Sequence, residues 1–228
     1  MIKLYHGSTK IVDHPEFGIG NPKNDYGLGF YCTQDLEMAK EWACTDDRSG
    51  FANSYLLDAG GLSTLDLNGE DYHILNWLAV LLDNRVFELN GGLPLAAKEY
   101  VLDNYLPEYN NYDIIKGYRA DDSYFSFSRD FLNGTISLEQ LGVAMRLGKL
   151  GEQVVLKSHE AFEAITFVDA ERAERDLYYP KRMSRDRKAR EEYRKQKEIN
   201  EVATGTYIID IIRQGWKNDD ARLRQDIS

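Results

Sequence analysis

An α+β fold is predicted for this chain, with helices inserted between short strands. Short apolar segments bounded by glycine or polar turn residues recur up to about residue 168, and segments with helical spacing separate them. These elements do not alternate as βαβ units, so a regular parallel sheet is not expected. From Glu171 onward the sequence becomes charged and helix-forming, which indicates a helical C-terminal extension.

The predicted strands are short and end at turn-forming residues. The first one ends at Gly7-Ser8, and residues 9–27 form a loop rich in Gly, Pro, Asn and Asp. Two later strands flank Gly60-Gly61, which predicts a hairpin. Strands are expected at residues 2–6, 28–33, 54–57, 62–67, 113–118, 153–156 and 165–168.

The predicted helices carry apolar residues at helical spacing together with capping signals. Thr33 is expected to cap the first helix, and Ser137 with Gln140 three residues later has the pattern of a capping box. The helix at residues 71–85 has the strongest pattern, with leucines and Trp77 on one face. Helices are expected at residues 33–43, 71–85, 95–106, 122–132, 137–147 and 182–200.

The composition fits one sizeable domain, alone or with an appendage. The chain has 228 residues, 43% of them hydrophobic, which is enough for a core without disulfide support. Its two cysteines, Cys32 and Cys44, lack CxxC spacing and its histidines are isolated, so we expect a reducing compartment and no metal site. There is no basic and apolar leader and no stretch of about 18 apolar residues, so we expect a cytoplasmic protein without a membrane partner.

The charge is distributed unevenly along the chain. The net charge of -10 argues against a protein that acts mainly by coating nucleic acid phosphates. Residues 171–200, however, hold eleven Lys and Arg against seven Asp and Glu. This shift predicts a boundary between a domain at residues 1–170 and an extension at residues 171–228. The extension ends in an apolar run, residues 207–212, followed by Trp216, so we expect it to dock on the domain or on a partner protein.

Two motifs near the N-terminus predict a small-molecule cleft. The first is Leu-Tyr-His-Gly-Ser, with His6 at its centre, and the second is Asp-Tyr-Gly-Leu-Gly-Phe-Tyr-Cys-Thr, which places Tyr31 near the end of a strand. A histidine offers a hydrogen-bonding ring nitrogen, a tyrosine offers a flat aromatic face, and glycines let a ligand approach the backbone closely. Small-molecule clefts are often lined in this way.

These motifs resemble the first two motifs of ADP-ribosyltransferases of the His-Tyr-Glu kind. The likeness continues through an Ala-x-x-Trp-Ala helix, the segments YDIIKGYRADD and EQVVLKSHEAFEAITF, and an Arg- and Asp-rich tail. Over almost its whole length the chain is similar to DUF3990, a bacterial family of unknown function assigned to the ADP-ribosyltransferase superfamily. The resemblance implies an ADP-ribosyltransferase-like core of short strands in a split sheet that binds NAD as its substrate.

The resemblance also implies roles for residues of the first two motifs. His6 would bind the ribose next to nicotinamide, Tyr31 would stack on the nicotinamide ring, and the backbone of Gly7 would bond the nicotinamide amide. Ser8 would support this contact, and Thr33 would reach a ribose or, as capping signals favour, cap the helix. Cleavage of the glycosidic bond passes through an oxocarbenium-like sugar, so a group fixed at the ribose 2'-hydroxyl stabilises the transition state.

The third motif departs from the His-Tyr-Glu pattern. Glu152 and Gln153 lie on opposite faces of a strand because side chains alternate, and the resemblance places Gln153 at the position of the catalytic glutamate. A neutral amide can hold the hydroxyl but offers no full negative charge, so NAD binding is better supported than rapid turnover. Arg119, which follows a strand and precedes a helix, would meet the phosphates. Glu152 or Asp121 would assist the acceptor.

Three functions follow from this reading of the sequence. The first is a mono-ADP-ribosyltransferase that modifies a protein, a nucleic acid or a small molecule, and the resemblance implies a toxin or effector with a neutralising, antitoxin-like partner protein. The second is a non-catalytic module that binds NAD, ADP-ribose or a partner protein. The third is an NAD glycohydrolase, for which water is the acceptor. The sequence alone leaves the acceptor open.

Overall fold

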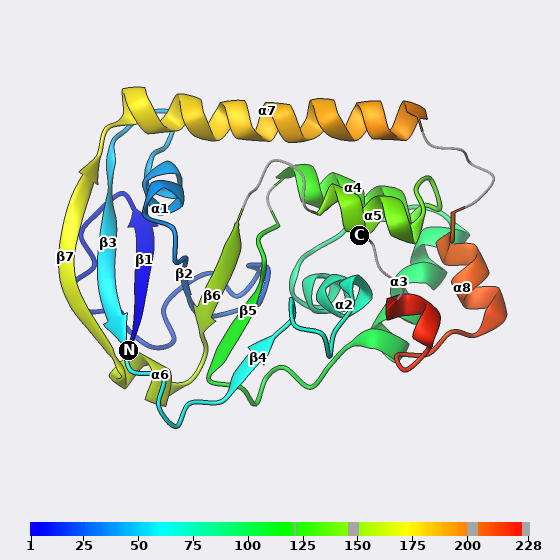
Figure 1. Ribbon diagram of the computed structural model, residues 1–228, viewed down its shortest axis with the longest axis horizontal. Coiled ribbons are helices and arrows are strands. Elements are labelled where there is room, and N and C mark those ends of the chain that lie inside the picture. Colours follow the sequence, from blue (N-terminus) through cyan, green and yellow to red (C-terminus); the bar gives the residue numbers. More distant parts are fainter. Residues whose placement is uncertain (121, 146–150, 200–204, 225–228) are drawn as a thin grey trace.

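Two small sheets and a group of helices make up the mixed α+β fold of the computed structural model (Figure 1). It describes residues 1–120, 122–145, 151–199 and 205–224, with the backbone alone at residues 122–124 and 196–199. One sheet has the order β1-β3-β7 and is antiparallel, with β1 at Ile2–Ser8, β3 at Gly50–Leu57 and β7 at Ile165–Ala173. The other has the order β2-β6-β5-β4, with β2 at Phe30–Cys32, β6 at Glu152–Leu156, β5 at Ile114–Tyr118 and β4 at Thr64–Asp66.

A backbone bridge between Tyr5 and Thr33 joins the two sheets. The Tyr5 amide donates to the Thr33 carbonyl at 2.8 Å, and the Thr33 amide donates to the Tyr5 carbonyl at 2.9 Å. Because β1 and β2 are edge strands of their sheets, this bridge lies where the sheets meet. It brings the first and second sequence motifs side by side.

Most of the helices lie together on one side of the second sheet and enclose the largest core cluster, which contains Trp77, Leu78, Phe127 and Phe131 (Figure 1). Most of the predicted helices are confirmed, and the Ser137–Gln140 capping box is present, with an amide-to-hydroxyl distance of 3.2 Å. The helices are α1 Leu36–Ala43, α2 Ile74–Asn84, α3 Gly92–Tyr105, α4 Asp122–Leu132, α5 Leu138–Ala144, α6 His159–Glu163, α7 Arg175–Ile199, α8 Ile208–Gln214 and the short 3-10 helix η2 Ala221–Arg224.

The C-terminal extension packs on the rest of the chain. Helix α7 runs along one edge of the molecule, from α1 at one end to α4 and α5 at the other (Figure 1). It is attached to α4 by Tyr193, whose hydroxyl donates to Asp130 at 2.7 Å. Farther along, Ile208, Ile211 and Trp216 are buried in the largest core cluster. The apolar run predicted to dock on the domain or on a partner therefore contacts the chain's own core.

The predicted hairpin around Gly60-Gly61 is wrong. The strand before these glycines, β3, pairs with β1 and β7 in the first sheet, whereas the strand after them, β4, pairs in parallel with β5 in the second sheet. Strand β3 is the central strand of its sheet and pairs with β1 along one edge and β7 along the other, so no free edge remains for β4. The glycine turn therefore carries the chain from one sheet to the other.

Thr33 is not the cap of helix α1. The cap is Asp35, whose carboxylate accepts from the amides of Glu37 at 2.8 Å and Met38 at 3.1 Å. The backbone of Thr33 is already used in the bridge to Tyr5, so the helix cannot begin there. The hydroxyl of Thr33 accepts from the Asp35 amide at 3.2 Å and is part of the turn that precedes the helix.

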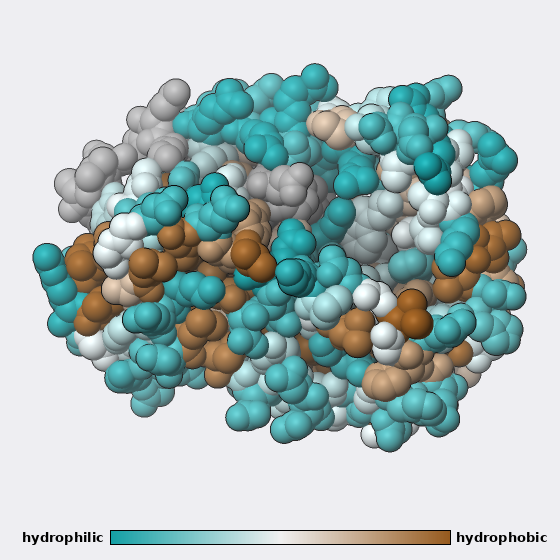
Figure 2. Space-filling model, turned by 180° about the vertical axis from the view of Figure 1, so that it is seen from behind, coloured by the Kyte–Doolittle hydropathy of each residue, from teal (hydrophilic) through white to brown (hydrophobic). Residues whose placement is uncertain are grey.

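The surface seen from behind is largely hydrophilic, with smaller hydrophobic areas between the polar residues (Figure 2). None of the helices in the described part of the chain combines the length and the apolar content that a membrane span requires. Cys32 and Cys44 are both buried and form no disulfide with each other.

Candidate functional site

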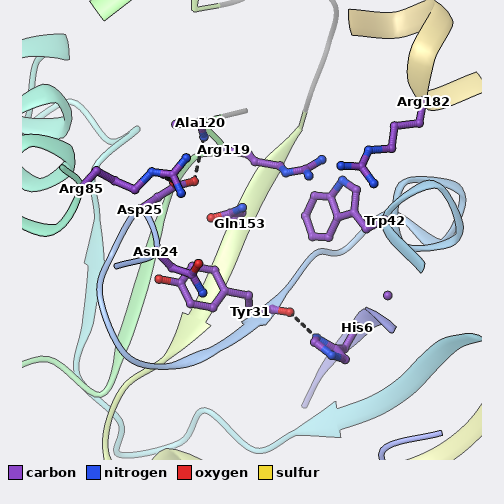
Figure 3. A pocket seen from close by; sticks show the side chains of 11 residues that line it. His6, Asn24, Asp25, Tyr31, Trp42, Arg85, Arg119, Ala120, Gln153 and Arg182 are labelled. Atoms are coloured by element: carbon purple, nitrogen blue, oxygen red, sulfur yellow. Dashed lines mark hydrogen bonds and ion pairs between the residues drawn. The ribbon is translucent and has the colours of Figure 1, made fainter. Parts of the chain in front are cut away.

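A cavity of about 310 Å³ opens where the two sheets meet, beside helices α1 and α7 (Figure 3). It is lined by five residues that the sequence singled out: His6, Gly7, Tyr31, Arg119 and Gln153. These residues come from β1, β2, β6 and the segment after β5, so the fold joins positions far apart in the chain. Ser8 and Thr33 are not among the described lining residues, and Asp121 lies outside the described residues.

His6 offers a hydrogen-bond acceptor to the cavity. Its Nδ1 lies 2.7 Å from the carbonyl oxygen of Tyr31 (Figure 3). Because a carbonyl only accepts, Nδ1 carries the proton, and in the neutral ring Nε2 keeps its lone pair. Burial lowers the pKa of His6 below its usual value, and the bond to Tyr31 raises it in part. The imidazole is therefore neutral at pH 7, with Nε2 as an acceptor.

Close packing requires glycine at residue 7, and the backbone of Gly7 lies beside the cavity. A Cβ here would lie 2.1 Å from the Ala39 carbonyl oxygen and 2.9 Å from the Trp42 Cβ, so α1 packs directly on β1 at this residue. The backbone groups of Tyr5 bond to Thr33, and in an antiparallel strand the residue two positions on directs its groups toward the same edge. The amide and carbonyl of Gly7 thus lie on the same edge of β1 as those of Tyr5, beyond the bridge to Thr33. At this point Gly7 lines the cavity.

Tyr31 presents its ring and not its hydroxyl. The hydroxyl donates to the Gly27 carbonyl at 2.6 Å and accepts from the Tyr26 amide at 3.1 Å. Burial raises the pKa of Tyr31, so it is protonated at neutral pH and cannot act as a base. Gly27 has φ of 73°, a left-handed conformation that favours glycine. The second motif thus holds the ring in one place.

Gln153 is the buried polar residue of the cavity. It is 6% exposed, and its Oε1 has no hydrogen-bond partner in the part of the chain that the structure describes. Buried acceptors are nearly always satisfied, so an unpartnered acceptor on a residue that lines a cavity is a candidate contact for a ligand. Glu152 points the other way, is exposed, and accepts from Asn68 at 2.8 Å. This pair confirms the predicted alternation along β6.

Positive charge collects at one side of the cavity. Arg119 and Arg182 reach toward each other above Trp42 (Figure 3), and the guanidinium carbon of Arg119 lies 4.5 Å from the Trp42 ring centre. On the opposite side, Asp25 accepts from the Ala120 amide at 2.9 Å and lies 3.5 Å from the Arg85 side chain. Of the described lining residues, three are arginines and one, Asp25, is acidic. The cavity therefore favours an anionic ligand.

Comparison with known families gives one match. Residues 2–167 match the family described as "Protein of unknown function (DUF3990)". The chain belongs to the DUF3990 family. No curated protein matches the chain, and no solved structure matches it either. The part that matches DUF3990 contains β1 to β6 and only the start of β7, and it ends before α7.

Sequence reasoning missed six of the lining residues: Asn24, Asp25, Trp42, Arg85, Ala120 and Arg182. Asp25 and Trp42 lie inside segments that carry the likeness to DUF3990, so their place in these motifs could have marked them as site residues. Arg85 lies at the end of α2, and Arg182 is one of eleven Lys and Arg in residues 171–200. Arg182 also lies outside the segment that matches DUF3990, and nothing local distinguishes it from its neighbours.

Proposed function

We propose that this protein binds NAD and is a mono-ADP-ribosyltransferase that cleaves the nicotinamide-ribose bond. The observation that carries the proposal is that His6, Tyr31 and Gln153, from β1, β2 and β6, line one cavity. A ring nitrogen and an amide oxygen that have no hydrogen-bond partner among the described residues, together with a fixed aromatic face, match the groups of a ribosyl-nicotinamide. Under this proposal the fold is an ADP-ribosyltransferase core, and residues 1–170 are its NAD-binding domain.

The proposed binding mode assigns one contact to each group. The nicotinamide ring stacks on Tyr31, and its carboxamide bonds the backbone of Gly7. The ribose hydroxyls donate to Nε2 of His6 and to Oε1 of Gln153, because both atoms are acceptors that lack a described partner. The phosphates lie toward Arg119, where the positive charge collects.

The proposed reaction breaks the bond between C1' of the ribose and the nicotinamide nitrogen. The electron pair of this bond goes to the nitrogen, which leaves as neutral nicotinamide, and the ribose becomes an oxocarbenium ion. A nucleophile of the acceptor then bonds to C1' and releases its proton. Gln153 holds the 2'-hydroxyl as positive charge develops. Because its amide is neutral, we expect slower turnover than a glutamate would give.

The acceptor we propose is a macromolecule, a protein or a nucleic acid, as the resemblance to toxins and effectors implies. Helix α7 lies beside the cavity and exposes Lys188 and Arg194 to solvent. These side chains offer a positively charged surface to an acidic acceptor. An antitoxin-like protein that neutralises the activity belongs to the same proposal.

The second candidate is a module that binds NAD or ADP-ribose without cleaving it. Two points favour it. The resemblance puts Gln153 at the position where a carboxylate would stabilise the oxocarbenium ion, and Asp25, the one acidic residue among the described lining residues, is engaged by Ala120 and Arg85. Both candidates require the same binding mode, and they differ in turnover alone.

Nicotinamide release from NAD tests the proposal. The purified protein is incubated with NAD at neutral pH, with and without cell lysate, beside His6→Ala and Gln153→Ala and the exposed control Arg187→Gln. Release that lysate increases and that His6→Ala abolishes supports a transferase, and free ADP-ribose without a modified macromolecule indicates a glycohydrolase. No release, with NAD still raising Tm, supports the binding module. No release and no effect of NAD on Tm would overturn both candidates.

A further inference from the structure

We propose that Arg182 of helix α7 joins Arg119 and the indole N–H of Trp42 in an anion subsite that binds the diphosphate of the ligand. The C-terminal extension would then be part of the binding site and not an appendage to it. The identity of the anion as a diphosphate rests on the proposed function. The subsite itself rests on the arrangement of these three side chains.

The first argument is electrostatic. Arg119 and Arg182 reach the same side of one cavity (Figure 3), so their positive charges add there and attract an anion. The acidic residue among the described lining residues, Asp25, lies on the opposite side with Arg85. In a chain of net charge -10, two guanidinium groups on one cavity wall mark a place for an anion.

The second argument is an unsatisfied donor. The indole Nε1 of Trp42 is buried and has no hydrogen-bond partner among the described residues. A tryptophan N–H can only donate, so its partner must be an acceptor. Trp42 lines the cavity below the two arginines (Figure 3). A diphosphate has oxygens on two phosphorus atoms and can accept from the indole and from both guanidinium groups.

The third argument is that Arg182 is held in place. Three residues further along α7, Arg185 makes two hydrogen bonds to Glu41 of α1, at 2.8 and 3.0 Å, and the Glu41 side chain is 4% exposed. Residues three apart lie on the same face of a helix, so this ion pair turns Arg182 toward α1 and the cavity. The guanidinium of Arg182 also donates to the Cys44 carbonyl at 3.3 Å, just beyond the end of α1.

The subsite combines residues of the extension with residues of the segment shared with the family. Residues 2–167 match DUF3990, whereas Arg182 and Arg185 follow that segment. Arg119 and Trp42 lie inside it. The proposal therefore predicts that the anion contact depends on a helix that the family match does not include.

Titration calorimetry on the full chain tests the proposal with three probes: ADP-ribose, inorganic pyrophosphate, and nicotinamide riboside, which has no phosphate. The variants are Arg182→Gln and Arg182→Lys, and the matched control is Arg187→Gln, an exposed arginine on the same helix. We expect Arg182→Gln to weaken the affinity for ADP-ribose and for pyrophosphate by about 10- to 100-fold, because one charge-assisted hydrogen bond is lost. We expect Arg182→Lys to lose less affinity, because lysine keeps the positive charge although it lacks the paired N–H donors of the guanidinium group.

Binding of nicotinamide riboside should be the same in the wild type and in Arg182→Gln, and Arg187→Gln should match the wild type with every probe. Pyrophosphate binding that depends on Arg182, without binding of ADP-ribose or NAD, would support the anion subsite and overturn the proposed function. Binding of NAD and ADP-ribose that Arg182→Gln leaves unchanged would overturn the subsite and leave the proposed function standing. A wild type that binds none of the phosphate probes would overturn both.

Discussion

His6 of β1 and Tyr31 of β2 are joined by a hydrogen bond of 2.7 Å from Nδ1 to the main-chain carbonyl. The two residues lie on edge strands of different sheets, next to the Tyr5–Thr33 bridge. The tautomer of His6 is therefore set by the junction between the sheets. The same junction brings Tyr31, whose hydroxyl bonds to the Gly27 carbonyl, to the cavity beside His6.

NAD binding should weaken in acid because of His6. Burial lowers the pKa of His6 below its usual value of about 6.5, so the neutral acceptor form persists down to that lowered pKa. As the pH falls through it, Nε2 gains a proton and can no longer accept from a ribose hydroxyl. NAD affinity, measured by calorimetry across the acidic range, should be constant above about pH 6.5 and fall below it. A His6→Gln variant, which keeps an acceptor, should bind with a flatter pH profile.

Gln153 should control turnover more than binding. Gln153→Ala removes the acceptor at the 2'-hydroxyl, and we expect nicotinamide release to fall by about 100-fold, as for loss of one preorganised group. Gln153→Glu supplies the negative charge that the amide lacks and should raise the release rate. Single-turnover kinetics with NAD measure both effects. Equal rates in Gln153→Glu and the wild type would show that this side chain does not face the developing charge.

Tyr26 and Gly117 should be energetically coupled. The Tyr26 hydroxyl donates to the Tyr118 carbonyl at 2.5 Å and accepts from Trp77 at 3.0 Å, and a Cβ on Gly117 would lie 2.2 Å from its oxygen. Tyr26→Phe should cost about 1–3 kcal/mol by leaving buried groups unpaired, and Gly117→Ala about 1–3 kcal/mol by overpacking.

Denaturant unfolding of the double variant tests this coupling. Its loss of stability should be smaller than the sum of the two single losses, since removing the hydroxyl relieves the clash. Gly92→Ala is the matched control, because no atom lies within 4 Å of a Cβ at that residue. Strict additivity of the two losses would mean that the backbone at Gly117 shifts away from Tyr26.

Stability should fall on acidification because of His73. Burial lowers the pKa of His73 to about 4, and hydrogen bonds to Asn218 raise it in part. The unfolded chain therefore binds the proton first, so stability is complete above about pH 6.5 and is lost as the pH falls toward 4, by up to about 3 kcal/mol. Urea unfolding across this range should show a smaller loss in His73→Asn than in the wild type. The exposed control His14→Asn should follow the wild type.

Removal of residues 171–228 should unfold the protein. The deletion removes Ile208, Ile211 and Trp216 from the largest core cluster. Trp216→Ala, a milder change, should cost about 3–5 kcal/mol, whereas Leu177→Ala, at a residue 52% exposed, should cost little. Thermal unfolding followed by circular dichroism compares the variants. A truncated chain with a cooperative transition near that of the full chain would contradict the assignment of these residues to the core.

Much of the local structure could be predicted from the sequence. Helix α2 and the capping box of Ser137 and Gln140 depend on residues three or four apart, so their signals are complete within one segment. The opposite orientations of Glu152 and Gln153 follow from strand alternation alone. These predictions hold because the interactions that decide them are local.

The pairing of strands that are distant in sequence could not be predicted in the same way. The glycines at 60 and 61 signal a turn whether the flanking strands pair with each other or, as here, with different sheets. Thr33 and Asp35 are both residue types that cap helices, and the bridge to Tyr5 excludes Thr33. Each outcome depends on a partner distant in sequence.

The sequence by itself determined most of the elements, though not the short helices α6 and α8, and the residue types at His6, Tyr31 and Gln153, because hydrophobic spacing and motif chemistry act over a few residues. The tertiary structure alone decided that these residues line one cavity, and that Arg85 and Arg182 join them. The reason is physical. Burial of apolar surface between the sheets and the helices fixes which distant segments meet, and no local pattern contains that information.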